Sequence, residues 1–525
     1  MAETRIITIE NVVGGFAPSN TDNPLRPVDG LEDQYSMADV IDVFQANKLG
    51  DLAPGNVFDI VDVGSTSFID LPMNAITDSN NKAWLVGSNS NLYRLDLSAE
   101  TNDNRFTPGT DIVGGTDFVD LLTFRDQNGT EWIAWTYDAA NANQADIARI
   151  QNNGLLSTRN TSFGSGLTGS GKLTKGIPHR MWNGPDGLIY CTNGRYIFQH
   201  DPITTTGNHQ ALDLGADWVS QAGVSYGNFS AIIGYKATTV SGANLARSQC
   251  RLWLWDGFSP DPNFIYPIND NYVSAIINKD EVLYIFSEGL ENKTRVWIFN
   301  GSQLKEVASA YDSAIDSGPK QGSVEIFRGF PHWLQNPGDG NVSAVFPVGN
   351  GRYGIHELMH AYSDATSMSA TGFLKNLRSN SLVLHGGVNL NGVNSLVKQN
   401  TTKYHTSSTF TTRLISLPYR STIKRINIYF SQFGTGASLQ VAMFEDYDAV
   451  SLGGAADILK NAASDIKTLT NTALGSVRQH SIHTYLNDIN SFYLHFAWNH
   501  AAVTNTAAII RKIEILYEPT TVSNI

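Results

Sequence analysis

Apolar and aromatic residues occur along most of the chain in short runs separated by turn-rich stretches. Seven five-residue segments share one pattern, because most begin with an apolar residue and all end with Asp, Asn, Gln or Glu. They are LYRLD (92–96), IARIQ (147–151), IFQHD (197–201), LWLWD (252–256), VWIFN (296–300), YGIHE (353–357) and LVKQN (396–400). Their starts are 55, 50, 55, 44, 57 and 43 residues apart. A polar residue after an apolar run suits a turn, so this spacing predicts a structural repeat.

A second apolar run precedes most of these segments. In KAWLVGSNSNLYRLD and GLIYCTNGRYIFQHD, a loop rich in Gly, Asn and Ser joins the two runs, which predicts a β-hairpin. Repeats of about 40–50 residues with four strands each are typical of a β-propeller. We therefore predict an all-β protein with a propeller over residues 56–403. Seven blades fit best, six or eight are the alternatives, and unrelated hairpins in a large sandwich are the competing interpretation.

The first 55 residues differ from the repeats. GGFAPSNTDNPLRPVDG is rich in Gly, Pro and Asn and predicts an extended arm. SMADVIDVFQANKLGDLAPG can hold one or two helical turns before Pro54 and Gly55 end them. An extended arm without its own core usually lies on a neighbour, in the same chain or in another, so we expect residues 1–55 to be a docking arm.

From residue 404 to residue 525 apolar and polar residues alternate. In STIKRINIYF one predicted face carries Ile423, Arg425, Asn427 and Tyr429, and the other carries Lys424, Ile426, Ile428 and Phe430. Alternating strands without crossover helices favour an antiparallel β-sandwich of the jelly-roll kind. The insert at 456–474 is expected to form a short helix.

Composition narrows the function classes. Charged residues make up 16%, Gly is plentiful at 46, and the net charge is −13 without a block of Lys or Arg, so we expect neither a nucleic-acid nor an anionic-membrane partner. No apolar run approaches the roughly 18 residues of a membrane span, and we expect no membrane insertion. The polar start MAETRIITIEN does not resemble a signal peptide. Cys191 and Cys250 lie in apolar runs and are expected to be buried thiols.

The motif with the clearest chemistry is His356-Glu357-x-x-His360 in YGIHELMHAY. On a helix, both imidazoles would share a face and hold one zinc ion, while the Glu would activate its water. On a strand, the two histidines would lie about 13 Å apart at ~3.3 Å per residue. Because YGIHE aligns with the other repeats, we predict a strand, with His356 and Glu357 at its end and His360 in a following turn or short helix.

Two further matches are incomplete. GLTGSGKLT (166–174) has Gly166, Gly171 and Lys172 in the spacing of a phosphate-binding loop, but Leu173 replaces the Ser or Thr that would hold magnesium. We interpret it as a loop between blades. RDQNGTEW (125–132) resembles the Asp-box turn of sialidase propellers, with altered spacing and without a second copy, so we interpret Asn128-Gly129 as a hairpin turn.

The C-terminal stretch HFAWNHAA could present a sugar-binding surface through Trp498, His495 and His500, although core packing explains these residues equally simply. Acidic residues are scattered and define no glycosidase pair. We therefore predict no catalytic, cofactor-binding or metal-binding residues, and no enzymatic activity.

Taken together, the arm with Gly14-Gly15-Phe16, the propeller and the C-terminal strands resemble virion proteins of tailed bacteriophages. ADVID (38–42) and the later LG and LAPG (49–55) resemble the segments that precede a propeller in such proteins, and STIKRINIYF and AAIIRKIEILYE resemble the strands that end them. The resemblance implies a structural tail or tail-associated protein without catalytic residues.

We accordingly expect a non-enzymatic docking module of a phage particle, assembled in the host cytoplasm. Its expected partners are other virion or tail proteins in a symmetric homo-oligomer, with a host-surface glycan as a further candidate. The alternatives are a glycan-binding, receptor-binding or carbohydrate-hydrolysing propeller and, third, a zinc hydrolase that uses His356, Glu357 and His360.

Overall fold

The structure of the protein is a computed structural model. It describes residues 4–10, 15–16, 34–39, 41–42, 52–61, 68, 70–88, 91–98, 101–106, 120–138, 144–160, 163–164, 173–239, 245–289, 293–311, 319–334, 341–349, 352–360, 368–377, 383–390, 392–431, 436–445, 459, 468–470, 478–500 and 508–520. Within these residues the regular elements are β-strands and two short 3-10 helices, η2 (Leu156–Thr158) and η3 (Gln321–Ser323). None of the described helices is long and apolar enough to cross a membrane.

Seven four-stranded sheets follow one another among the described residues. Blades 1 and 2 consist of β7 (Pro72–Thr77), β8 (Lys82–Gly87), β9 (Leu92–Asp96), β10 (Thr101–Phe106), β11 (Leu121–Arg125), β12 (Glu131–Asp138), β13 (Gln144–Gln151) and β14 (Leu173–Thr174). Blades 3 and 4 consist of β15 (Met181–Asn183), β16 (Ile189–Asn193), β17 (Tyr196–Asp201), β18 (Thr206–Asp213), β19 (Trp218–Tyr226), β20 (Phe229–Thr239), β21 (Leu245–Trp255) and β22 (Phe264–Ile268). Blades 5 and 6 consist of β23 (Tyr272–Lys279), β24 (Val282–Gly289), β25 (Lys293–Phe299), β26 (Leu304–Tyr311), β27 (Val324–Phe327), β28 (Phe330–Leu334), β29 (Asn341–Gly349) and β30 (Arg352–His360). Blade 7 consists of β31 (Met368–Lys375), β32 (His385–Leu390), β33 (Val393–Tyr404) and β6 (Asn56–Ile60).

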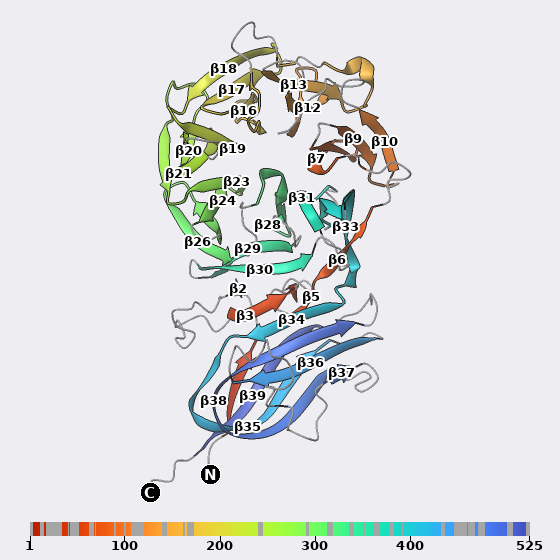
Figure 1. Ribbon diagram of the computed structural model, residues 1–525, viewed down its shortest axis with the longest axis vertical. Coiled ribbons are helices and arrows are strands. Elements are labelled where there is room, and N and C mark those ends of the chain that lie inside the picture. The colour runs from red at the N-terminus through yellow and green to blue at the C-terminus, as the bar shows by residue number, and fades with distance from the viewer. Residues whose placement is uncertain are drawn as a thin grey trace. The chain divides into compact units, whose positions relative to one another are not determined.

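This arrangement confirms the predicted all-β fold and the seven-bladed propeller. Each blade is an antiparallel sheet whose order follows the sequence, except that β6 precedes blade 1 in the chain and completes blade 7. Figure 1 shows the first strands β7, β19, β23 and β31 lining the middle of the ring.

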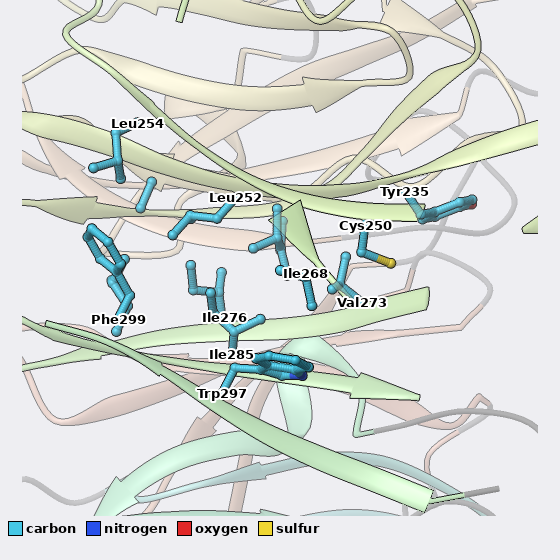
Figure 2. Close-up of a cluster of buried hydrophobic side chains, with 14 residues drawn as sticks. Tyr235, Cys250, Leu252, Leu254, Ile268, Val273, Ile276, Ile285, Trp297 and Phe299 are labelled. Carbon is cyan, nitrogen blue, oxygen red and sulfur yellow. The ribbon is translucent and has the colours of Figure 1, made fainter. Parts of the chain in front are cut away.

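Buried side chains join neighbouring blades. Between blades 4 and 5, residues from both sheets form one core: Ala222, Ala231, Ile233, Tyr235, Cys250, Leu252, Leu254, Ile268, Val273, Ile276, Leu283, Ile285, Trp297 and Phe299. Figure 2 shows how these side chains meet. Burying one Leu- or Ile-sized side chain contributes about 1.5–3 kcal/mol, so such layers supply most of the cohesion between blades.

The ring closes between the last blade and the first. The Val61 amide donates to the Leu396 carbonyl at 2.8 Å, and Phe68 forms a bridge with Asn394. One buried cluster then combines side chains of both blades: Val61, Phe68, Ala75, Ala83, Leu85, Tyr93, Leu95, Leu97, Phe373, Leu377 and Leu396. Closure thus covers the facing surfaces of both blades at this seam.

The repeat alignment is correct for six segments and wrong for one. LYRLD, IARIQ, IFQHD, LWLWD, VWIFN and LVKQN all fall in the third strand of their blades. YGIHE belongs to β30, the fourth strand of blade 6, and the third strand there is β29. The error arose because β29 contains Pro347 and lacks the apolar run with a polar end that the other third strands show.

The chain folds into two compact units, 59–340 with 364–398, and 1–58 with 341–363 and 399–525. The predicted boundaries 1–55, 56–403 and 404–525 stay a prediction. In the second of these units, a nine-stranded sheet has the order β1, β39, β35, β38, β34, β3, β2. In addition, β36 pairs with β38, and β37 pairs with β36. Its strands are β1 (Arg5–Ile9), β2 (Gly15–Phe16), β3 (Gln34–Asp39), β34 (Ser407–Thr412), β35 (Ile415–Phe430), β36 (Ala437–Phe444), β37 (Thr468–Thr470), β38 (Gln479–His500) and β39 (Ile510–Pro519), and β4 (Ile41–Asp42) pairs with β5 (Ala53–Pro54).

The strands of this sheet are antiparallel apart from the pair β2–β3. The long strand β38 pairs through its first part with β35 and through its last residues with β34 and β36. The sandwich arrangement of these strands stays a prediction. Because β1 pairs with β39 and β3 pairs with β34, the strands β1, β2 and β3 of the predicted arm belong to the C-terminal sheet of their own chain.

A bulge corrects the predicted faces of β35. Ile423 lies opposite Tyr517 while Arg425 lies opposite Leu516, so Lys424 is an extra residue in the strand. One extra residue moves everything beyond it to the other face. Ile423 therefore shares a face with Ile426, and both side chains are fully buried.

Other expectations have mixed outcomes. The helical turns expected before Pro54 are wrong for residues 36–39 and 41–42, which are strands, and 43–51 lie outside the described residues. The helix expected at 456–474 also falls mostly outside them, and Thr468–Thr470 form a strand. Cys191 and Cys250 are buried free thiols, as predicted.

Candidate functional site

The H-E-x-x-H match lies wholly inside strand β30. His356 is opposite Ala344 and Glu357 is opposite Ser343 in β29, and β30 continues to His360. The predicted strand is confirmed, but its predicted end at Glu357 and the turn or helix at His360 are wrong. Two positions four apart on a strand lie about 13 Å apart along the backbone. This is not the helical arrangement in which both imidazoles point at one zinc ion.

The near match to a phosphate-binding loop cannot be assigned a geometry, because Gly166, Gly171 and Lys172 lie outside the described residues. Leu173 and Thr174 form β14, the outer strand of blade 2. In a phosphate-binding loop, these positions would begin a helix instead.

The turn after the first strand of blade 2 is built around Asp126. One carboxylate oxygen accepts from the amides of Asn128 at 2.9 Å and Thr130 at 3.0 Å, and the other accepts from Trp132 Nε1 at 3.0 Å. Burial disfavours the charged carboxylate, but the hydrogen bonds from Trp132, Thr130 and Asn128 outweigh it and hold the pKa of Asp126 below its usual range. Gly129 has a φ of +75°, which confirms the hairpin turn.

Blade 1 contains a second copy of this turn, so the expectation of a single copy is wrong. Asp78 accepts from the amides of Asn80 at 2.8 Å and Lys82 at 3.0 Å, and from Trp84 Nε1 at 2.8 Å. The signal was present in the sequence, since TDSNNKAW and RDQNGTEW both place Trp six residues after Asp. In both blades the aspartate anchors a strand and a turn.

In blade 3, a tyrosine takes the place of the tryptophan that donates to the aspartate in blades 1 and 2. Asp186 accepts from the Leu188 amide at 3.1 Å and from the Tyr190 hydroxyl at 2.5 Å. Burial, followed by the hydrogen bond to Asp186, raises the pKa of the Tyr190 hydroxyl well above its usual value.

In several blades, an Asp or Asn also fixes the turn between the third and the fourth strand. In blade 4, Asp256 accepts from the Phe258 amide at 2.9 Å, and in blade 3, Asp201 accepts from the Ile203 amide at 2.8 Å. The same bond to the residue two positions on recurs at Asp96, Asn153 and Asn300. These are Asx turns, and they explain the polar residue that ends most of the repeated segments.

The residue displayed by this turn differs between blades. In blades 1 and 5 it is Ser98 and Ser302. In blades 2, 3 and 4 it is a large apolar residue that is mostly exposed: Leu155 at 58%, Ile203 at 55% and Phe258 at 79%. In an antiparallel blade, the first and third turns lie at the same end of the sheet. The three side chains therefore occupy one face of the ring, on consecutive blades.

Three carboxylates buried just before the first strand of a blade have internal partners. Asp120 accepts from the Met181 amide at 2.8 Å, and Asp70 accepts from the Tyr93 hydroxyl at 2.8 Å. Asp270 accepts from Trp297 Nε1 at 3.0 Å and pairs with Arg295 at 3.0 Å. Burial raises the pKa of Asp270 above its usual value despite these partners. Each carboxylate thus holds strands together, within its blade or across blades.

His200 lies between blades 2 and 3, fully buried, with its ring 4.3 Å from that of Phe163. Neither ring nitrogen has a hydrogen-bond partner among the described residues. Burial lowers the pKa of His200 to about 4. The imidazole therefore serves as an uncharged packing group at neutral pH.

The aromatic side chain considered for sugar binding belongs to the core. Trp498 is 1% exposed, and its Nε1 donates to the Ala508 carbonyl at 2.7 Å. His495 Nδ1 bonds the Thr411 hydroxyl at 2.8 Å. The side chain of His500 lies outside the described set. Core packing of Trp498 is thus confirmed.

The strand pairing defines the class of this chain as a seven-bladed β-propeller with an additional, mostly antiparallel β-sheet. No protein-family model and no curated protein sequence matches it. Solved structures similar to it include the β-propeller domain of Cps50 (Swd1) from Myceliophteria thermophila, at 7% identity over 65% of this chain and 99% of that chain, with a TM-score of 0.41. Raptor from Chaetomium thermophilum matches at 10% identity over 66% of this chain and 30% of that chain, with a TM-score of 0.42. The RRP9 WD40 repeats match at 11% identity over 66% and 99%, with a TM-score of 0.42.

Proposed function

We propose that this protein is a non-enzymatic structural component of a tailed-phage particle and acts as a docking and assembly module. The observation that carries the docking role is the set of Asx turns in blades 2, 3 and 4. They hold Leu155, Ile203 and Phe258 in the solvent at one face of a closed ring. Large exposed apolar side chains on a rigid scaffold are typical of protein–protein contact surfaces.

The buried polar groups support the same proposal. Asp70, Asp120 and Asp270 satisfy their oxygens within the fold, and Asp78 and Asp126 anchor turns. Carboxylates engaged in this way stabilise a scaffold, whereas general acid or base catalysis needs a carboxylate that faces a substrate.

The assignment to a phage particle rests on the resemblance of residues 14–16, 38–42 and 49–55 to tail-associated proteins. It implies a virion location, other tail proteins as partners and a symmetric homo-oligomer.

Quantitative mass spectrometry of purified particles tests the proposal. We expect peptides of this chain at a fixed ratio to the major tail protein, in a number that matches a ring symmetry. Particles that are infectious and lack the chain would overturn the virion role.

A further inference from the structure

We propose that the outer corner of blade 4 and the adjoining turn of blade 3 form a docking surface for a partner protein segment that is both apolar and positively charged. We call it the blade-4 corner and define it by Phe258, Phe264 and Ile265, beside the turn of blade 3 that contains Asp186. It deepens the proposed docking function and rests on it.

Exposed apolar side chains are concentrated at this corner. Phe258 is 79% exposed, Phe264 is 51% exposed and Ile265 is 48% exposed. The ring of Phe264 packs edge-on against Phe229 with centroids 5.8 Å apart. Phe229 begins the second strand of blade 4, after its first turn, so this contact links both turns of the blade at the same end.

The turn that carries Phe258 is held in place before any partner arrives. Asp256 accepts from the amides of Phe258 at 2.9 Å and Ser259 at 2.8 Å, and from Asn263 Nδ2 at 2.9 Å. These hydrogen bonds hold the pKa of Asp256 far below its usual range. A side chain on such a fixed turn loses little conformational entropy on binding.

Blade 3 supports the turn from the other side. Gly257 has a φ of +86°, and a Cβ placed there would overlap the Tyr190 hydroxyl oxygen. Gln199 Nε2 donates to the Gly257 carbonyl at 3.3 Å. Glycine is therefore required at this position, because the turn rests directly on blade 3.

The outer strand of blade 4 differs from the outer strands of its neighbours. β22 reads FIYPI and has no charged residue, whereas β18 contains Asp213 and β26 contains Lys305 and Glu306. Charged residues on edge strands normally prevent association with other chains. The sequence of β22 favours an apolar contact at this edge.

Charge identifies the chemistry of the partner. The turns at 183–188, 201–206 and 256–263 contain four aspartates, Asp186, Asp201, Asp256 and Asp261, and no Lys, Arg, Glu or His. An apolar surface set among like charges selects a partner that brings positive charge to its rim. A second copy of this chain would bring the same four carboxylates and a net charge of −13, so it fits this surface poorly.

Fluorescence anisotropy with the full chain and three labelled peptides tests this inference. The probes alternate Leu with Lys, Leu with Glu, and Ser with Lys. We expect the Leu/Lys peptide to bind most tightly, because it alone combines both properties. Phe258→Ser and Phe264→Thr should each weaken its binding about tenfold, and Asp261→Asn about twofold with a smaller dependence on salt.

Val393→Ser provides the matched control, since Val393 is 55% exposed on blade 7. This variant should bind as the unchanged protein does. Equal binding of all three peptides, or an equal loss in the Val393→Ser and Phe258→Ser variants, would overturn the inference. Circular dichroism of each variant establishes that its fold is retained.

Sedimentation of the unchanged protein and of Phe258→Ser tests whether a second copy of this chain occupies the corner. We expect the same mass for both at the same concentration. If the unchanged protein is a larger oligomer that dissociates on Phe258→Ser, a second copy occupies the corner and the proposed partner is wrong. A failed peptide experiment with the chain present in particles would refute the docking surface and leave the proposed function standing.

Discussion

Single aspartates determine the geometry of the blade ends. Asp78 and Asp126 each connect a turn to the indole of a tryptophan six residues later, and Asp201 and Asp256 each form an Asx turn. A carboxylate is suited to these positions because it accepts several hydrogen bonds at once and has a short side chain. These four aspartates, which look scattered in the sequence, are therefore structural.

The two Asp–Trp turns make a matched pair for mutagenesis. Asp78 and Trp84 are buried, so Asp78→Ala should remove the carboxylate that accepts from the indole N–H and lower the free energy of unfolding by about 1–3 kcal/mol. Asp126→Ala should cost less, because water can reach Trp132, which is half-buried. Urea unfolding measures both. Equal losses for the two variants would contradict this explanation.

His200 gives a pH-dependent prediction. Its pKa of about 4 lies below the ordinary value of 6.5, so between these pH values the unfolded chain binds more protons than the folded chain. The free energy of unfolding should therefore fall as the pH is lowered from about 6.5 to about 4, by up to ~3 kcal/mol from this residue.

Replacing His200 by Leu should remove that part of the pH dependence. The corresponding third-strand positions hold Leu95, Trp255 and Phe299, all buried, so an apolar residue fits. His332, whose pKa burial lowers to about 3, contributes in the same direction in both proteins, and the comparison between them cancels it. Urea unfolding at pH 7 and pH 5 gives the measurement, and parallel losses in both proteins would refute the assignment to His200.

At the scale of the strands, the sequence predicted the repeat well where the third strand carries a strong apolar pattern. Six of the seven segments fall in third strands because an apolar run followed by an Asx turn is a local feature that the residues themselves specify. The prediction was wrong in blade 6 because β29 contains Pro347, and it is recognised as the third strand only by its pairing between β28 and β30. The bulge at Lys424 was not predictable for a similar reason, since it is defined only by the two strands that flank it.

The seam between blades 7 and 1 depends on a close approach of the backbone. A Cβ on Gly372 would overlap the Pro72 carbonyl oxygen, and a Cβ on Gly387 would overlap the same atom. Gly372→Ala should therefore destabilise the protein by about 3 kcal/mol through overpacking. Gly392→Ala is the control: its φ is +82° but nothing among the described residues lies within 4 Å, so strain of about 1 kcal/mol is expected. Thermal unfolding that ranks the two variants in the opposite order would contradict the described seam.

The strand conformation of Arg352–His360 also leads to a prediction about zinc binding. Since His356 and His360 lie on β30 and not on a helix, added Zn²⁺ should shift the thermal unfolding temperature of the unchanged protein and of His356→Ala by the same amount. Calorimetry with zinc and with a chelator measures this shift. Stabilisation by zinc that disappears on His356→Ala would show that the histidines share an ion after all.

At the scale of the whole molecule, two compact units are formed from interleaved segments of one chain. The propeller could be predicted from the sequence because its repeats are local, as could the antiparallel strands near the C-terminus. The blade-4 corner could not be predicted from the sequence. It brings together three turns that are separated in the sequence and become neighbours only when the ring forms. Its function therefore follows from which residues the turns display.

The central claim is that this protein is a docking module of a phage particle, and electron cryo-microscopy of that particle tests it most directly. We predict density for a seven-bladed ring in symmetry-related copies, with a neighbouring protein in contact with Phe258 and Phe264 through apolar and basic side chains. A particle map that accounts for all its density without this fold would contradict the claim.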